Sequence, residues 1–166
     1  MVTGATVPTL ARVARPTGTK PIVENRRSRF DYELLDRLEA GIVLTGTEVK
    51  SLRDGRVTLA QSYADLRGQE VFLIGAEIAE YGQGNIANHE PTRDRKLLLR
   101  RDEIDGLLGK VREKGLTLVP TRMYFKDGKV KVEIALARGK DKGDKRRTIA
   151  DREAKRQMDR ALKSRR

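Results

Sequence analysis

Hydrophobic and polar positions alternate, or recur in short runs, between residues 30 and 137, and this pattern predicts a mainly β body. A loop rich in Gly and Asn is expected over Tyr81–Pro91. Asp127-Gly128 favours a type I′ hairpin turn, since both central residues need positive φ. Strands are predicted at 30–34, 42–44, 62–66, 71–74, 97–99, 116–119, 122–125 and 130–136.

Two helices are expected within this body. A short one spans Thr47–Arg53, and a stronger one is marked by apolar residues at helical spacing and a stop at Gly115; these are Ile104, Leu107, Leu108 and Val111. Short antiparallel strands with few helices predict a small, closed or partly open β-barrel with short flanking helices.

The two ends of the chain lack the alternation of the body. Residues 1–25 show no period and are predicted to be a flexible extension. The body then covers 26–137 and the tail 138–166. Arg138–Arg147 is expected to be disordered alone, being dense in charge. Further on, a stripe made mostly of alanine predicts a marginal helix that folds on a surface it binds: Ala150, Ala154, Met158 and Ala161.

Charge separates the same three segments. The net charge of the 166-residue chain is +12. Residues 1–29 carry six Lys or Arg and one acidic residue, and residues 138–166 carry thirteen Lys or Arg and five acidic residues. Residues 30–137 are nearly neutral, with seventeen Lys or Arg and eighteen acidic residues. A neutral body with basic ends is typical of a protein that binds a polyanion, because Lys and Arg release counterions from phosphates. The alternative is that the basic ends only aid solubility.

The chemistry of a catalyst is missing from the sequence. There is no cysteine, the single histidine is His89 in the expected loop, and no glycine-rich phosphate loop occurs. We therefore expect no enzyme activity, no metal and no cofactor. No run approaches the roughly 18 apolar residues of a membrane span, so we expect a cytoplasmic protein without membrane contact. Basic residues around 97–99 form either a phosphate-contacting face or a solvated rim: Arg93, Arg95, Lys96, Arg100 and Arg101.

A series of motifs resembles the small protein B family, the SsrA-binding proteins of bacteria. The resemblance covers about Asn25–Lys163, in order and at the family's spacing. Its motifs are 39–53 (EAGIVLTGTEVKSLR), Gly55-Arg56-Val57, Gln61-Ser62-Tyr63, Asn88-His89-Glu90-Pro91, 93–99 (RDRKLLL), 115–120 (GLTLVP), 129–140 (KVKVEIALARGK) and Asp144-Lys145-Arg146.

This resemblance implies an oligonucleotide-binding (OB) type barrel that binds the tRNA-like domain of transfer-messenger RNA. It also implies delivery of that RNA to stalled ribosomes for trans-translation. The basic tail would form a helix in the empty mRNA channel at the small-subunit decoding centre. The RNA-binding positions that it implies are Glu39, Leu98 and Lys131, with Arg93, Lys96 and Lys129 as plausible phosphate contacts. The tail positions are Asp144, Lys145 and Arg146, followed by Lys155 and Arg156.

One position departs from the family's pattern. Many relatives carry His or Tyr before Asp-Lys-Arg, where this chain has Gly143. A ring there could stack on a ribosomal base, and glycine cannot. The alternative function, which charge and strand pattern leave open, is a structural ribosomal or general RNA-binding barrel.

Overall fold

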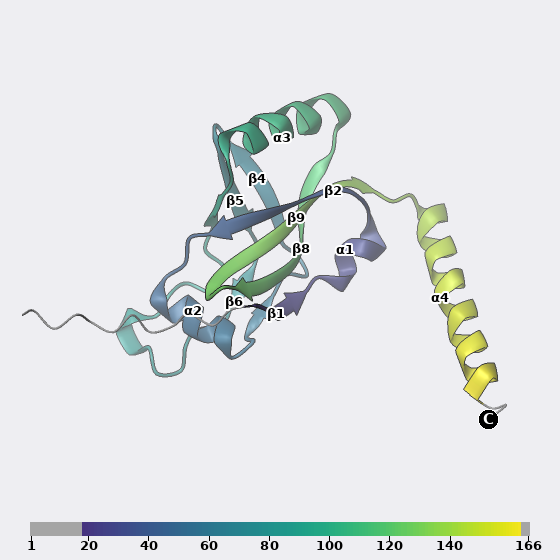
Figure 1. The fold of residues 1–166 in the computed structure, drawn as a ribbon, viewed down its shortest axis with the longest axis horizontal. Coiled ribbons are helices and arrows are strands. Elements are labelled where there is room, and N and C mark those ends of the chain that lie inside the picture. The colour runs from purple at the N-terminus through teal and green to yellow at the C-terminus, as the bar shows by residue number, and fades with distance from the viewer. Residues whose placement is uncertain (1–17, 164–166) are drawn as a thin grey trace, which may run out of the picture.

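The computed structural model describes residues 18–163, apart from the side chains at 113 and 114 (Figure 1). Within this region nine strands, three helices and one 3₁₀ turn precede a last, long helix. In order the elements are β1 Thr19–Glu24, α1 Arg26–Asp31, β2 Tyr32–Ile42, α2 Gly46–Arg53, β3 Val57–Thr58, β4 Tyr63–Arg67, β5 Glu70–Ile74, β6 Glu77–Ile78, a 3₁₀ turn Asn85–Ala87, β7 Arg95–Leu98, α3 Arg101–Lys114, β8 Thr117–Lys126, β9 Lys129–Gly139 and α4 Lys142–Lys163.

The main sheet of this region is antiparallel and has seven strands in the order β1-β8-β4-β5-β7-β2-β9. An additional pairing of β8 with β9 connects the last strand in this order back to the second, so the sheet curls around one core. β3 and β6 form a separate two-stranded sheet. The predicted mainly β, OB-fold-like architecture with a few helices is confirmed.

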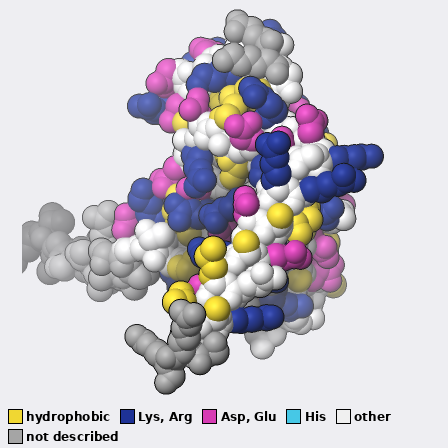
Figure 2. All heavy atoms as spheres, turned by 90° about the vertical axis from the view of Figure 1, so that its right-hand side faces the viewer, with side chains coloured by type: hydrophobic (Ala, Val, Ile, Leu, Met, Phe, Trp, Pro, Cys, Tyr) yellow, Lys and Arg dark blue, Asp and Glu magenta, His cyan; other side chains and the backbone are white. Residues whose placement is uncertain are grey.

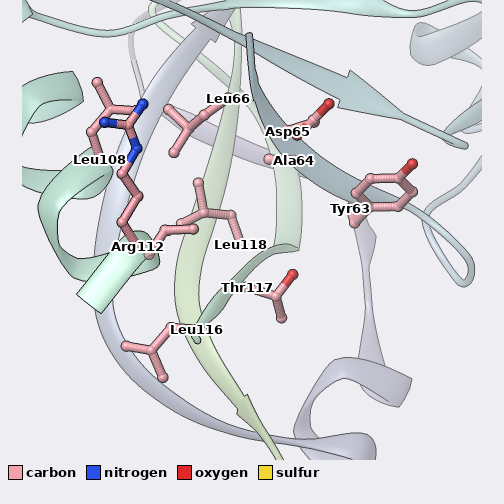
Figure 3. Close-up of a pocket in the computed structure, with 10 residues that line it drawn as sticks. Tyr63, Ala64, Asp65, Leu66, Leu108, Arg112, Leu116, Thr117 and Leu118 are labelled. Carbon is pink, nitrogen blue, oxygen red and sulfur yellow. The ribbon is translucent and has the colours of Figure 1, made fainter. Parts of the chain in front are cut away.

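The core lies inside the curled sheet and beneath α3. Ile104 and Leu107 of α3 are buried in it, with Leu108 and Val111 packed at its edge, which confirms the predicted helix face. Gly115 ends α3 in the left-handed conformation at φ 58°. A pocket of about 340 Å³ remains between α3 and β4 (Figure 3), and four of its ten lining residues are leucines.

The predicted hairpin at Asp127-Gly128 is confirmed, and a second hairpin joins β4 to β5. β8 and β9 are joined by Asp127 and Gly128 at φ 50° and 76°, as the type I′ turn requires. β4 and β5 are joined through Gly68, at φ 63°. Positive φ is costly for most residues, so these Asp and Gly positions fix the register of both hairpins.

Several predicted strand boundaries were wrong. The expected strands at 30–34 and 42–44 are one strand, β2, and Phe30 lies in α1 instead. α1 forms because Asn25 caps it: the Asn25 side chain accepts a hydrogen bond from the Ser28 amide at 3.2 Å. The strands expected on either side of Pro120 are also one strand, β8. A bulge between Pro120 and Arg122 accommodates the proline, which cannot donate to a ladder.

Both ends differ from their predictions. The extension expected to be flexible over 1–25 contains β1, which pairs with β8 from Thr19 to Glu24; residues 1–17 lie outside the described region. The segment expected to be disordered over 138–147 is largely strand and helix in the structure. β9 continues to Gly139, and α4 begins at Lys142. Hydrogen bonds from Lys140 to α1 carbonyls, described below, supply the ordering that the local sequence lacks.

Candidate nucleic-acid interface

One row of side chains crosses four neighbouring strands on the outer face of the sheet. Leu98 of β7 is opposite Gly41 of β2, Gly41 is opposite Lys131 of β9, and Lys131 is opposite Tyr124 of β8. Residues directly opposite in antiparallel strands point to the same face. Of the predicted RNA-binding residues, Leu98 and Lys131 are therefore brought together, although they are distant in sequence. We call Leu98, Gly41, Lys131 and Tyr124, with Glu39, the outer row.

Gly41 makes room for Leu98 in this row. A β-carbon placed on Gly41 would lie 3.2 Å from the β-carbon of Leu98, closer than side chains usually approach. Leu98 remains 52% exposed, which is unusual for a leucine in the middle of a sheet. The outer row therefore presents an apolar contact beside a cationic one.

Glu39 forms the acidic part of the outer row. Its carboxylate accepts a hydrogen bond from the hydroxyl of Tyr124 and two from Lys126 Nζ, at 3.1 Å each. The Tyr124 hydrogen bond, with Lys126 and nearby Lys131, holds the pKa of Glu39 below its usual value. Burial and the bond to Glu39 raise the pKa of Tyr124 to about 12. At neutral pH the pair is therefore an ionised carboxylate and a neutral phenol.

The lysines of this face differ in how far they are engaged. Lys96 continues the face on β7 and pairs with Glu70 of β5. Lys129 and Lys131, by contrast, enter no ion pair within residues 18–163. They are the lysines of the predicted set that are free to meet a phosphate without first breaking a protein contact.

Arg93 is held by the protein. Its Nε and Nη2 donate to the two carboxylate oxygens of Glu48, at 2.8 and 2.6 Å. It also donates to the carbonyls of Val43 and Asp94. Its side chain is 30% exposed. Of the predicted phosphate contacts, it has the most donors already committed to protein acceptors.

Glu48 is the centre of a buried ion cluster that the sequence reasoning missed. Its fully buried carboxylate also accepts from Arg95 Nε at 2.8 Å and from the Thr45 amide at 2.7 Å. Burial alone would raise the pKa of Glu48, but hydrogen bonds from Arg93, Thr45 and Arg95 outweigh it and lower that pKa. Thr45-x-x-Glu48 is a capping-box pattern, the signal that could have revealed it.

Arg95 is neither a phosphate contact nor a rim residue. It is completely buried, and its remaining donors reach the carbonyls of Ala76, Arg93 and Pro91. The guanidinium therefore ties the loop that ends at Pro91 to the sheet. This cluster supports β7, and with it Lys96 and Leu98.

His89 is a structural residue of the same loop. Its Nε2 lies 2.9 Å from the carbonyl oxygen of Ile78, and its Nδ1 lies 2.9 Å from Thr47 Oγ1. Because a carbonyl only accepts, Nε2 carries the proton and Nδ1 accepts from the Thr47 hydroxyl. The ring is buried and saturated with partners, which fits the expectation that it is not a catalyst.

Among residues 18–163, no three His, Cys, Asp or Glu side chains gather in a way that could hold a metal ion. In the same region no helix has the length and apolar character needed to cross a membrane.

The predicted tail residues all lie on α4, which projects to one side of the sheet that carries the outer row (Figure 1). They are Asp144, Lys145, Arg146, Lys155 and Arg156. Lys145 pairs with Asp31 of α1 at 3.2 Å, and its side chain is 36% exposed. Gly143 lies in the first turn of α4 with open space around it. The structure thus forms two separate groups from the predicted residues, one on the sheet and one on α4.

Comparison with known proteins shows the family of this chain. The family model described as SmpB protein matches residues 22–164. The chain belongs to the SmpB family. An SsrA-binding protein of Acidothermus cellulolyticus is 56% identical over 150 residues, which is 90% of this chain and 94% of that one. An SsrA-binding protein of Thermobifida fusca is 57% identical over 149 residues, covering 90% and 93%.

A solved structure also resembles this family member. It is described as "tmRNA-SmpB: a journey to the center of the bacterial ribosome", and it matches with a TM-score of 0.61 and 53% sequence identity. The match covers 72% of this chain and 85% of the other. The resemblance to the SmpB family seen in the sequence motifs is thereby confirmed.

Proposed function

We propose that this protein is an RNA-binding adaptor of trans-translation. It binds the tRNA-like domain of transfer-messenger RNA and carries it to stalled ribosomes in the cytoplasm, where the incomplete peptide is tagged. Family membership supports this role, together with relatives that are SsrA-binding proteins and a solved tmRNA-SmpB structure. The chemistry it contributes is binding, not catalysis, and it needs no cofactor.

The outer row is the observation that carries the RNA-binding part of this proposal. It combines a free lysine, an exposed leucine and an ionised carboxylate on one open face: Lys131, Leu98 and Glu39. The lysine suits a phosphate, the leucine suits the apolar part of a sugar or base, and the carboxylate accepts from base amines or hydroxyls. Lys96 and Lys129 extend the cationic part, and Arg93 contributes mainly by supporting it.

The tail supplies the ribosomal part of the proposal. α4 is helical and strongly basic, and every described side chain from Arg152 to Lys163 is exposed. We place it in the empty mRNA channel near the decoding centre, with Asp144, Lys145, Arg146, Lys155 and Arg156 facing ribosomal RNA. The open space around Gly143 leaves room for a ribosomal base to approach the backbone there, in place of a stacked ring.

Competition binding with a matched pair of variants tests the RNA-binding role. Lys131→Gln removes the free lysine of the outer row, whereas Lys110→Gln removes a lysine of α3 that pairs with Asp36. Lys131→Gln should weaken binding of the tRNA-like domain about ten-fold or more and reduce the salt slope by about one. Lys110→Gln should leave both nearly unchanged.

A duplex RNA of equal length serves as the competitor. The proposal predicts that the wild-type protein prefers the tRNA-like domain, and that Lys131→Gln loses much of this preference. Equal affinity for both RNAs would instead indicate a general RNA-binding protein, and equal behaviour of the two variants would remove the outer row from the interface.

A further inference from the structure

A groove of about 570 Å³ lies between α1 and α4, away from the outer row. Five arginines line it, with one glutamate and one aromatic ring: Arg26, Arg27, Arg29, Arg152, Arg156, Glu24 and Phe30. The side of the molecule that carries α4 shows Lys and Arg side chains beside a narrow run of hydrophobic ones (Figure 2). Two other pockets of the described region, one beside α3 and one around Asn25, are each lined by a single arginine.

The position of α4 beside α1 is fixed by contacts near the start of the helix. Lys145 Nζ lies 3.2 Å from a carboxylate oxygen of Asp31. Lys140 donates from its backbone amide to the Asp31 carbonyl and from its side chain to the Arg29 carbonyl, at 3.0 Å each. These three contacts bring the arginines of both helices to the same groove.

The charges of the groove are only partly balanced by the protein. Arg27 pairs with Asp31 at 3.0 Å, and Arg29 pairs with Glu24 at 2.8 Å. Arg26, Arg152 and Arg156 enter no ion pair within residues 18–163. Arg152 and Arg156 are also four residues apart on one helix, an arrangement of like charges that is destabilising unless an anion lies between them.

We propose that this groove binds the backbone of single-stranded RNA. The guanidinium group matches a phosphate with two parallel hydrogen bonds, and several unpaired arginines across one groove fit a chain of phosphates better than a single anion. Phe30 is half-buried in the groove and offers a ring on which an unpaired base can stack. Bases of a duplex are already stacked, so the ring favours a single strand.

Two arginines of α4 differ in their relation to the groove. Arg156 lines the groove, whereas Arg147 does not. Both are exposed residues of α4 that carry one positive charge. If only bulk charge mattered, the two arginines would be equivalent, whereas a binding site formed by the groove depends on Arg156. The groove contains none of the outer-row residues. Its binding of single-stranded RNA can therefore be tested independently of binding to the tRNA-like domain.

The test measures binding of a fluorescein-labelled single-stranded RNA dodecamer to the full chain by anisotropy over a range of salt. Arg156→Gln should weaken binding about five-fold or more and lower the salt slope by about 0.7, the value for one contact on a single strand. Arg147→Gln should change affinity less than about two-fold. Glutamine is a good helix former, so both variants keep α4.

A second matched pair tests the contribution of α1. Arg26→Gln should weaken binding as Arg156→Gln does, whereas Arg53→Gln, at the end of α2, should not. Phe30→Leu keeps an apolar side chain and should weaken binding about five-fold through loss of stacking. Binding of the tRNA-like domain should be unchanged in all these variants.

Three results would overturn the proposal. Equal losses in Arg156→Gln and Arg147→Gln would show that only bulk charge matters. Equal affinity for a duplex of the same length, with no effect of Phe30→Leu, would reject a single strand. Equal competition by a polyglutamate peptide of the same charge would show that the groove accepts any polyanion.

Discussion

Glu48 is an acidic residue on which several parts of the structure depend. One buried carboxylate caps α2 through the Thr45 amide and neutralises Arg93 and Arg95, so it connects α2 with β7 and the loop before it. Removing one partner of a buried ion pair leaves the other charge without compensation, which costs far more than losing a surface pair.

Glu48→Gln is therefore expected to lower the free energy of unfolding by about 3–5 kcal/mol. Glu70→Gln is the matched control: Glu70 is exposed and pairs with exposed Lys96, so its loss should cost about 1 kcal/mol or less. Urea unfolding of both variants measures the difference. Similar small losses in the two variants would contradict the assigned role of Glu48.

Acid sensitivity should follow from the same residue. The pKa of Glu48 is lower in the folded protein than in the unfolded chain, so its contribution to stability is full above the unfolded pKa and is lost as the pH falls below it. The wild type should lose stability steeply in this acidic range. Glu48→Gln should lose less over the same range, as measured by urea unfolding at several pH values.

At the scale of elements, α3 contains two glycines that its fold does not require. Gly106 and Gly109 are exposed, and a β-carbon at either would meet no atom within 4 Å. Gly115 differs, since it ends the helix at φ 58°, where other residues are strained.

Gly106→Ala and Gly109→Ala are each expected to raise the free energy of unfolding by about 0.5–1 kcal/mol, because alanine loses less backbone entropy in a helix. Gly115→Ala, the matched control, should lower it by about 1 kcal/mol. Thermal or urea unfolding checks all three. Destabilisation by the two mid-helix substitutions would show that α3 uses these glycines for a contact.

The elements that sequence predicted best have local causes. The apolar face of α3 and the Asp127-Gly128 turn depend on neighbours in sequence, and both were predicted. β1, the single strand β8 and the ordered start of the tail depend on distant partners, and these were missed. β1 forms on β8, and the start of α4 is held by Asp31, so no local pattern could reveal either.

The candidate site divides in the same way. The family resemblance named Glu39, Leu98 and Lys131, but periodicity alone could not have joined them, because their row depends on the register of β7, β2 and β9. Arg95 looked like its basic neighbours and is buried instead. A sequence shows which residues are charged, but only the packing shows whether a charged side chain lies in solvent or against a buried carboxylate.

For the whole molecule, the proposed function calls for two separate binding parts. The neutral body carries the outer row, and the basic tail carries α4. The expected boundary at residue 137 lies within β9, since Arg138 and Gly139 still pair with β2. Lys140 also donates to the Asp31 carbonyl, so a clean removal of the tail begins after Asp141.

The central claim is that these two parts act separately, and truncation after Asp141 tests it most directly. The truncated protein and the full chain are compared for affinity to the tRNA-like domain and for peptide tagging on ribosomes stalled without a stop codon. The account predicts nearly equal affinities and loss of tagging in the truncated protein. Full tagging without the tail would contradict it, and so would loss of RNA affinity in a truncated protein that still folds.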